Sequence, residues 1–469
     1  MKQQMEKSKL RKLLLVAGSG LLLCGSLTVQ PVGSAAQKSV APTVNVHDSQ
    51  SEVVRDKATS PEDQAVELRQ QSFEIVWRTV KDKHFDPTFG GVNWEQVRDN
   101  YAPRVAAVKT NQELYRVLQE MLGELHQSHF NIIPPEAVIP DDAKEPPTGG
   151  VGIDLRLLSN AAVITRVEAG SSAERAGLRP GFAIKQVGEK TVAQIAEPYA
   201  KSNDQRNLVQ VRVTRKLLSE INGEPGTTVA LSFTDEKERT RNVTLTREKL
   251  KGELSARLGN WPPQYTEFEM KRLAGNIGYI RFNIFTIPIV EKARTAIRSL
   301  SDADGLIFDL RGNPGGVAGI ATSIASQLSR KPGALGTMKM RASEMKFSIY
   351  PQQNAYDGPV VILLDGLSGS TSEVFSSGMQ ELGRAIIVGE RSAGACLPSA
   401  FQKLPTGALF QYAIADFKTP KGVLVEGRGV IPDVEVKWDR ASLLSGRDAQ
   451  LEAGIAALAH ARKPERGEK

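Results

Sequence analysis

Cysteine and histidine are scarce in this chain of 469 residues, which contains two cysteines and five histidines. Cys24 lies in an N-terminal segment that we expect to be removed, so Cys396 has no partner for an intramolecular disulfide. Stability must therefore come from core packing. The histidines lack the spacing and carboxylate partners of a metal site, so neither a metal nor another cofactor is expected. A concentrated basic stripe interleaved with aromatic residues is also missing, which argues against nucleic-acid binding.

The N-terminal segment, residues 1–36, has the pattern of a secretory signal peptide. Five basic residues precede the apolar run Leu13 to Leu23, and small residues follow as far as Ala35 and Ala36. The run is too short to predict a membrane span, and cleavage after Ala35 or Ala36 fits the small-residue rule. We therefore expect an exported protein, periplasmic or extracellular.

Removal of the signal peptide leaves 55 basic and 52 acidic residues, so the formal charge falls from +7 to +3. The basic character of the full chain is thus largely a property of the signal peptide. Leu-Leu-Leu-Cys24-Gly matches a bacterial lipoprotein box poorly, because Leu23 stands where that box requires a small residue. Membrane association is expected only if Cys24 is lipidated.

Composition and periodicity divide the remaining chain into regions. Residues 37–60 are rich in Ser, Val, Asp and Gln without a sustained period and predict a flexible stalk. Residues 61–135 have apolar residues at helical spacing, interrupted by turn residues from Asp86 to Gly91, and predict a small helical domain. The last residues, 446–469, are expected to form a polar C-terminal tail.

Residues 146–248 follow a proline-flanked hinge and are dominated by short β-type runs. One short helix, Ala173 to Ala176, ends at Gly177 before a turn. The expected strands are Ala162 to Val167, Ala183 to Val187, Val209 to Thr214, Val229 to Phe233 and Val243 to Thr246.

This second region resembles a PDZ domain. Gly150-Val151-Gly152-Ile153 matches the carboxylate-binding loop of such domains, and Ser171 to Gly181 matches the signature of bacterial PDZ modules attached to proteases. The resemblance implies that successive loop amides capture a peptide C-terminus while the neighbouring strand edge accepts the peptide as an added strand. A tight glycine-rich turn without a ligand is the alternative.

Residues 249–445 alternate between apolar runs and helical stretches. We expect strands at 276–282, 305–310, 360–364 and 385–388, and helices at 290–300, 317–328 and 372–382. This alternation predicts an α/β layer with a largely buried sheet.

The run Gly369-Ser370-Thr371-Ser372-Glu373 lies where an apolar strand gives way to a helix. A serine on such a turn exposes its hydroxyl, and the amides that open the next helix can stabilise an oxyanion. Ser370 is therefore a candidate nucleophile. Helix capping is the alternative, because Ser or Thr before Glu is also favoured at a helix N-terminus.

A second glycine-rich turn, Asp309 to Gly316, follows a buried strand. No Gly-Lys-Ser/Thr follows it and its glycines miss the dinucleotide spacing, so nucleotide binding is not expected. A glycine amide directed at an oxyanion fits this turn better.

The order of these segments resembles that of the C-terminal processing (tail-specific) serine peptidases, in the clan of the tricorn core protease. The resemblance covers about residues 61–440. It implies that Ser370 is the nucleophile. It also implies an oxyanion hole formed by the amide of Thr371 together with that of Gly315 or Gly316.

One departure from this family affects the expected base. Bacterial and chloroplast members use a lysine in a segment that here runs from Gly389 to Cys396, and Ala395 occupies the place of that lysine. Alanine cannot take a proton, and Arg391 is too basic to act as a general base at neutral pH. Lys403 is eight residues late and would need a different loop path.

A serine without a base is a weak nucleophile, so a histidine is the natural substitute. Ser128-His129, at the end of the helical domain, resembles the pair that supplies the base in the tricorn branch of the family. Glu426 has the spacing to Pro432-Asp433-Val434 of a glutamate that orients the machinery in that branch. The resemblance therefore implies His129 as general base and later acid, positioned by Ser128 and Glu426.

The predicted fold class is α/β and multidomain, with an N-terminal helical segment, an inserted PDZ domain and an α/β peptidase core of the crotonase-like or ClpP-like type. The expected function is a secreted or periplasmic serine endopeptidase that binds C-terminal segments of peptides or proteins and hydrolyses them through an acyl-enzyme. One alternative is a catalytically inactive relative that binds peptides or apolar ligands. Another is a Ser-Lys peptidase that uses Lys403.

Overall fold

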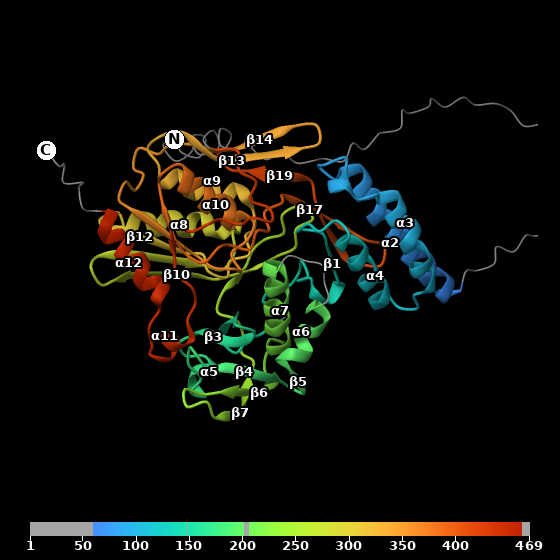
Figure 1. Ribbon diagram of the computed structural model, residues 1–469, viewed down its shortest axis with the longest axis horizontal. Helices are drawn as coiled ribbons and strands as arrows, with labels where there is room; N and C mark the ends of the chain where they lie inside the picture. The colour runs from blue at the N-terminus through green and yellow to red at the C-terminus, as the bar shows by residue number, and fades with distance from the viewer. Residues whose placement is uncertain (1–59, 147, 201–205, 462–469) are drawn as a thin grey trace, which may run out of the picture. The chain divides into compact units, whose positions relative to one another are not determined.

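The computed structural model describes residues 60–146, 148–200 and 206–461. The predicted signal peptide, Cys24 and nearly all of the predicted stalk lie outside these residues. Within the described ranges, no helix is long and apolar enough to cross a membrane. The fold is mixed α/β, with helices and several sheets (Figure 1).

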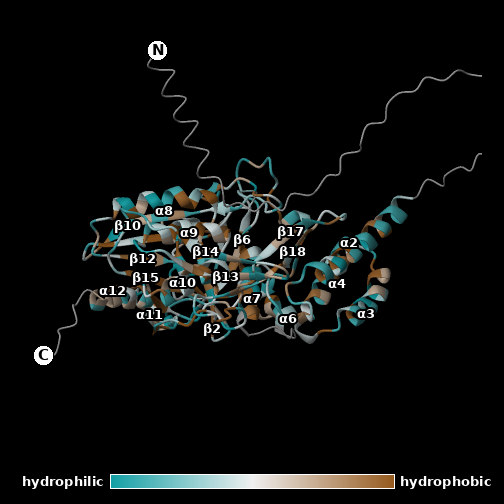
Figure 2. Ribbon diagram, turned by 90° about the horizontal axis from the view of Figure 1, so that it is seen from above, coloured by the Kyte–Doolittle hydropathy of each residue, from teal (hydrophilic) through white to brown (hydrophobic). Residues whose placement is uncertain are grey.

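Three amphipathic helices form the N-terminal part of the described chain. Ser60 and Thr110 cap the first and third of them, each in a reciprocal capping box. Figure 2 shows hydrophilic and hydrophobic residues alternating along these helices, as expected when one face is buried. That face packs with Leu404 and Phe410 from the C-terminal half of the chain. The elements are α2 (Pro61–Lys83), α3 (Trp94–Ala107) and α4 (Asn111–Gly123), with short 3-10 helices at Phe89–Gly91 and Pro135–Ala137.

An antiparallel sheet follows, in the order β2-β3-β4-β6-β7 with β5 paired to β4. Its strands are β2 (Ile153–Leu158), β3 (Ala161–Val167), β4 (Ala183–Val187), β5 (Lys190–Thr191), β6 (Thr228–Thr234) and β7 (Thr240–Thr246). The helices of this region are α5 (Ser172–Arg175), α6 (Val192–Ala200) and α7 (Arg206–Ile221).

The predicted strand from Val209 to Thr214 is wrong, because these residues belong to α7. Valines at alternate positions of this segment are typical of a strand. The buried residues Val213, Leu217 and Ile221, however, recur every four positions and pack with the apolar residues of the sheet, which is the spacing of one face of a helix. Tertiary packing has overridden local β-propensity.

The third region is built on a six-stranded sheet in the order β10-β11-β12-β15-β16-β20, parallel except for the β10–β11 pair. Every residue of β12 and β15 is buried, as in sheets covered on both faces. The strands are β10 (Phe268–Leu273), β11 (Ile277–Phe282), β12 (Gly305–Asp309), β15 (Val360–Leu364), β16 (Ile386–Gly389) and β20 (Val434–Glu435). The helices are α8 (Ile287–Ser299), α9 (Ala318–Gln327), α10 (Thr371–Glu381), α11 (Arg440–Leu444) and α12 (Ala449–Ala461).

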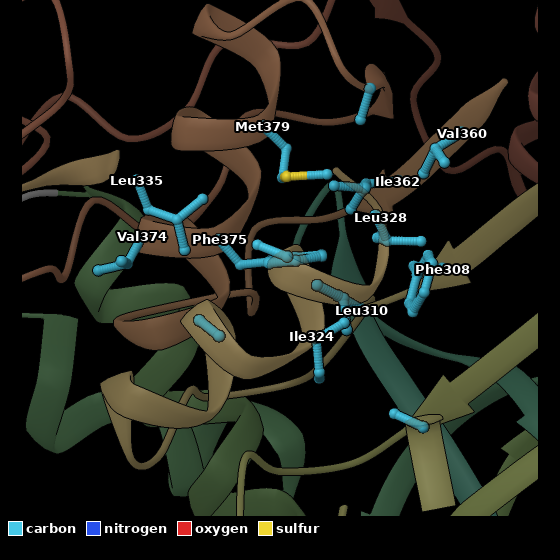
Figure 3. Close-up of a cluster of buried hydrophobic side chains, with 14 of the residues drawn as sticks. Phe308, Leu310, Ile324, Leu328, Leu335, Val360, Ile362, Val374, Phe375 and Met379 are labelled. Atoms are coloured by element: carbon cyan, nitrogen blue, oxygen red, sulfur yellow. The ribbon is translucent and has the colours of Figure 1, made fainter. Parts of the chain in front are cut away.

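Successive side chains of the central strands point to opposite faces of the sheet and pack into two separate hydrophobic cores. Phe308 packs edge-on against Phe375 of α10, with ring centroids 5.9 Å apart, in the cluster shown in Figure 3. Its neighbour Ile307 points to the opposite face and packs with Leu458 of α12. The predicted polar tail from residue 446 is therefore wrong over 449–461, where a helix covers the second face of the sheet.

Three smaller sheets complete the fold. β1 begins two residues after His129 and pairs with β18, which ties the end of the helical part to the C-terminal half of the chain. The orders are β1-β18-β17, β14-β13-β19 and β8-β9. The strands are β1 (Asn131–Ile133), β8 (Glu253–Leu254), β9 (Tyr265–Thr266), β13 (Gly333–Met340), β14 (Glu344–Ile349), β17 (Ser399–Lys403), β18 (Leu409–Ala413) and β19 (Ala415–Lys418).

Candidate active site

Ser370 lies on the turn between β15 and α10. Its backbone has φ 52° and ψ −117°, a region that residues other than glycine rarely adopt. The Ser370 amide donates to Glu373 Oε2 at 2.9 Å and to the Ala395 carbonyl oxygen at 2.7 Å. Hydrogen bonds from two segments thus hold the backbone in this strained conformation, which is the usual condition for strain at a functional site.

The second glycine-rich turn lies directly against the Ser370 turn. A Cβ atom on Gly315 would be 2.6 Å from Ser370 Cβ and 2.7 Å from Thr371 N, so only glycine fits there. The Gly315 amide donates to Asn313 Oδ1 at 2.9 Å. Within the described residues, the amides of Gly316 and Thr371 donate no hydrogen bond. Two free amides close to a serine are the arrangement that an oxyanion hole requires.

Ser128, His129 and Glu426 form a hydrogen-bonded relay. Ser128 Oγ lies 2.7 Å from His129 Nδ1 and donates to Glu426 Oε2 at 2.9 Å. The Ser128 amide donates to the other carboxylate oxygen, Oε1, at 2.8 Å. The fold therefore joins three residues of the predicted site, although Ser128 and Glu426 are 298 positions apart.

The direction of these bonds determines which nitrogen of His129 carries the proton. A serine hydroxyl has one proton, and Ser128 donates it to Glu426. Ser128 Oγ therefore accepts a hydrogen bond from Nδ1–H of the neutral imidazole. Nε2 is left unprotonated, which is the state that a general base requires.

The surroundings favour the neutral form of His129. Burial, and after it the positive charge of Arg215 in α7, lower the pKa of His129 from 6.5 to about 4. Burial also raises the pKa of Glu426, while hydrogen bonds from Ser128 and from the Cys396 amide act in the opposite direction. At neutral pH the imidazole is thus available to accept a proton.

Ala395 and Cys396 connect the relay to the Ser370 turn. Cys396 N donates to Glu426 Oε2 at 2.7 Å, and Cys396 Sγ lies 3.7 Å from the Ser370 carbonyl oxygen. Glu426 and Ser370 therefore contact the same short segment. Among the hydrogen bonds of the described residues, none joins Ser370 Oγ to His129.

The residue beside the Ser370 amide is thus Ala395, whose side chain cannot take a proton. Lys403 lies elsewhere, at the exposed end of β17. Its neighbour Gln402 accepts a hydrogen bond from Thr79 of α2. In the part of the chain that the structure describes, no hydrogen bond joins Lys403 to Ser370.

Glu373, which the sequence predicts only as part of a helix start, contacts the backbone of Ser370 in the structure. Its buried carboxylate accepts hydrogen bonds from the amides of Ser370, Gly394 and Ala395 and from the Ser392 hydroxyl. Burial raises its pKa to about 7. The Ser-x-x-Glu spacing was the available signal, but a capping box has the same spacing. In the described part of the chain, no group of acidic, histidine or cysteine side chains is arranged to hold a metal ion.

The loop Gly150–Ile153 leads into β2, which lies at an edge of its sheet. Gly150 and Glu248 exchange backbone hydrogen bonds, and a Cβ on Gly152 would be 2.2 Å from Ser171 Cβ. The amides of Val151 and Gly152 have no acceptor among the described residues. The loop thus has two amides without an acceptor, next to a strand that is paired on one side only.

Comparison with known proteins gives the wider relationship. Residues 276–436 match the model of peptidase family S41, and residues 66–123 match that of the tricorn protease C1 domain. The carboxyl-terminal-processing protease of Synechocystis sp. is 28% identical over 392 residues, which cover 81% of this chain and 84% of that protein. The tricorn protease of Thermoplasma acidophilum is 25% identical over 399 residues, which cover 83% of this chain and 34% of that protein.

Solved structures share the fold. A photosystem II D1 C-terminal processing protease has a TM-score of 0.55 at 22% identity, covering 79% of this chain and 93% of the other. Mature CPAF has a TM-score of 0.60 at 13% identity, covering 85% and 99%. The family match and the carboxyl-terminal-processing relatives indicate that the protein is a serine-type peptidase. Residues 276–436 are thus similar to peptidase family S41, and proteins similar to the chain include carboxyl-terminal-processing proteases.

Proposed function

We propose that this protein is an exported serine endopeptidase that cuts peptide or protein substrates with an accessible C-terminal segment, through an acyl-enzyme on Ser370. One observation carries the proposal: the Ser128 hydroxyl lies between His129 and Glu426 and leaves Nε2 of His129 free to accept a proton. This relay is present in a chain where Ala395 replaces the lysine of related enzymes. The carboxyl-terminal-processing relatives support the substrate class.

In the acylation step, His129 Nε2 takes the proton of Ser370 Oγ as this oxygen attacks the scissile carbonyl carbon. The amides of Thr371 and Gly316 stabilise the oxyanion, since the Gly315 amide is engaged by an asparagine side chain. When the C–N bond breaks, the imidazolium returns its proton to the leaving amine. Ser128 and Glu426 hold the charged ring in the manner of an aspartate in a catalytic triad.

In the deacylation step, the roles repeat with water as the nucleophile. His129 removes a proton from water, and the resulting hydroxide attacks the ester carbonyl. Collapse of this second intermediate breaks the bond to Ser370 Oγ, which regains its proton from His129. The products are the shortened substrate, ending in a carboxylate, and the free enzyme.

The loop Gly150–Ile153 is proposed to bind the substrate's terminal carboxylate. The free amides of Val151 and Gly152 are suitable donors, and β2 offers its edge for an added strand. A peptide ending in a free carboxylate should therefore have a lower KM than the same peptide with a C-terminal amide. Equal KM values would argue against carboxylate capture.

The catalytic assignment is tested with a fluorophosphonate probe and a peptide substrate. Wild-type protein should be labelled, and Ser370→Ala should not. His129→Ala should lose roughly 10²–10⁴-fold in kcat, the usual contribution of general acid–base catalysis. Lys403→Ala, the matched control, should keep full activity.

Each rival makes a different prediction in the same experiment. Absence of labelling in the wild type would support a catalytically inactive relative that binds peptides or apolar ligands. Loss of activity in Lys403→Ala, with activity kept in His129→Ala, would support a Ser-Lys peptidase.

A further inference from the structure

His84, at the C-terminal end of α2, is completely buried, yet nothing in the proposed mechanism uses it. Its Nε2 lies 2.9 Å from Gln127 Oε1, and its Nδ1 lies 2.7 Å from the Asp86 carbonyl oxygen. Its ring stacks with Phe85 and Phe130 at centroid distances of 4.6 and 5.6 Å. A buried polar ring held on several sides is a rigid anchor.

The segment that His84 contacts is the loop that carries the proposed base. His126 and His129 both have positive φ values, 51° and 62°, which are uncommon for histidine. Such a backbone persists only where its surroundings determine it. Gln127 lies between these two residues and directly before Ser128, whose amide and hydroxyl both donate to Glu426.

Separate contacts fix the two sides of this loop. On the far side, Gln119 of α4 donates to the Phe130 carbonyl oxygen and accepts from Ile132 N, each at 3.0 Å. On the near side, Gln127 is held by His84. Because the Gln127 amide has both a donor and an acceptor, it pairs with Nε2 in either neutral tautomer of His84. The hydrogen bond therefore does not depend on which ring nitrogen carries the proton.

We propose that His84 is a positioning residue for the peptidase reaction, acting through Gln127 to set the orientation of Ser128 and His129. The inference rests on the proposed function, because it assumes that His129 is the base. Loss of the His84–Gln127 hydrogen bond lets the 126–129 loop move, and small displacements of a reacting group are costly for rate. Substrate binding involves other residues, so the effect should fall on kcat and not on KM.

The test compares His84→Phe, which keeps a stacking ring, with Gln127→Met, which keeps the side-chain length. Each should lower kcat and the rate of fluorophosphonate labelling about tenfold or more, with KM within twofold of the wild type. The double variant should be no slower than the slower single variant, because both changes remove one hydrogen bond. His84→Gln, which places an amide near the position of Nε2, should recover most of the lost kcat even where it unfolds at a lower temperature.

The matched control is Trp77→Phe, which removes another buried hydrogen bond from α2, between Trp77 Nε1 and the Trp94 carbonyl oxygen. It should lower thermal stability and leave kcat unchanged. Wild-type kcat in folded Gln127→Met, additive losses in the double variant, or equal slowing by Trp77→Phe would overturn the inference. Full activity in His129→Ala would overturn the proposed function itself, so the two failures are distinguishable.

Discussion

Replacement of Gly315 by alanine is expected to slow the peptidase about 10²-fold. The new Cβ would lie 2.6 Å from Ser370 Cβ, 2.7 Å from Thr371 N and 2.8 Å from the Gly369 carbonyl oxygen. Carbon atoms in contact rest at about 3.5–4.0 Å, so the Ser370 turn must retreat by roughly 1 Å. A misplacement of about 1 Å at a reacting group costs about 10²-fold in rate. Gly315 also has a φ of 105°, which adds a strain cost of about 1–3 kcal/mol for alanine.

The assay measures kcat, KM and fluorophosphonate labelling, with urea unfolding to follow stability. Gly319→Ala is the control: no atom lies within 4 Å of its Cβ, and it lies in α9 just after the same turn. This control should keep wild-type kcat and gain up to about 1 kcal/mol, because alanine is the better helix former. If folded Gly315→Ala keeps its kcat and labelling rate within twofold, the two turns do not meet at the reacting atoms, and the proposed oxyanion hole is wrong.

Three other predictions concern charge and packing. Arg215→Ala removes a positive charge that lowers the pKa of His129. The acid limb of the pH profile of kcat/KM, expected near pH 4 in the wild type, should therefore move to higher pH. An acid limb at the same pH in both proteins would exclude an effect of Arg215 on His129. Burial raises the pKa of Glu373 to about 7 in the folded protein. Between about pH 4.5 and 7 the folded state therefore binds a proton that the unfolded state lacks. The free energy of unfolding should thus decrease as the pH rises through this window. In urea unfolding, the free energy of unfolding of Glu373→Gln should decrease less than that of the wild type over this pH window. An identical decrease would contradict the raised pKa of Glu373. Leu458→Ala should destabilise the protein by about 2–5 kcal/mol because it leaves a cavity between α12 and the sheet, whereas exposed His460→Ala should change stability by less than about 0.5 kcal/mol.

Several elements of the peptidase region could be predicted from the sequence because their signals are local. The apolar runs at β12 and β15 are confirmed as strands buried at every position, and α10 begins directly after Ser370. A continuous apolar run between turn residues has few other solutions in an α/β protein. The Ser370 turn is also predictable in this way, since strand, turn and helix are adjacent in the chain.

Two elements could not be predicted because their partners are distant in the sequence. In α7, the alternating valines favour a strand locally, and only the sheet beneath the helix decides otherwise. For the segment of α12, the sequence pattern predicts a polar tail. In the structure, Leu458 of this helix packs against the second face of the sheet. The burial of these two helices depends on contacts with residues far away in the sequence, and residue composition cannot predict such contacts.

The candidate site also has features that the sequence predicts and features that only tertiary contacts decide. The sequence by itself determined the residue types, the Ser370 turn and the alanine at position 395, because each is a property of a short segment. The tertiary structure alone decided that Ser128 bridges His129 and Glu426, since pairing of β1 with β18 and the Cys396 amide bring together segments far apart in the chain. It also decided the burial and the hydrogen-bond partners of Glu373 and His84, because both depend on the folded surroundings of each side chain.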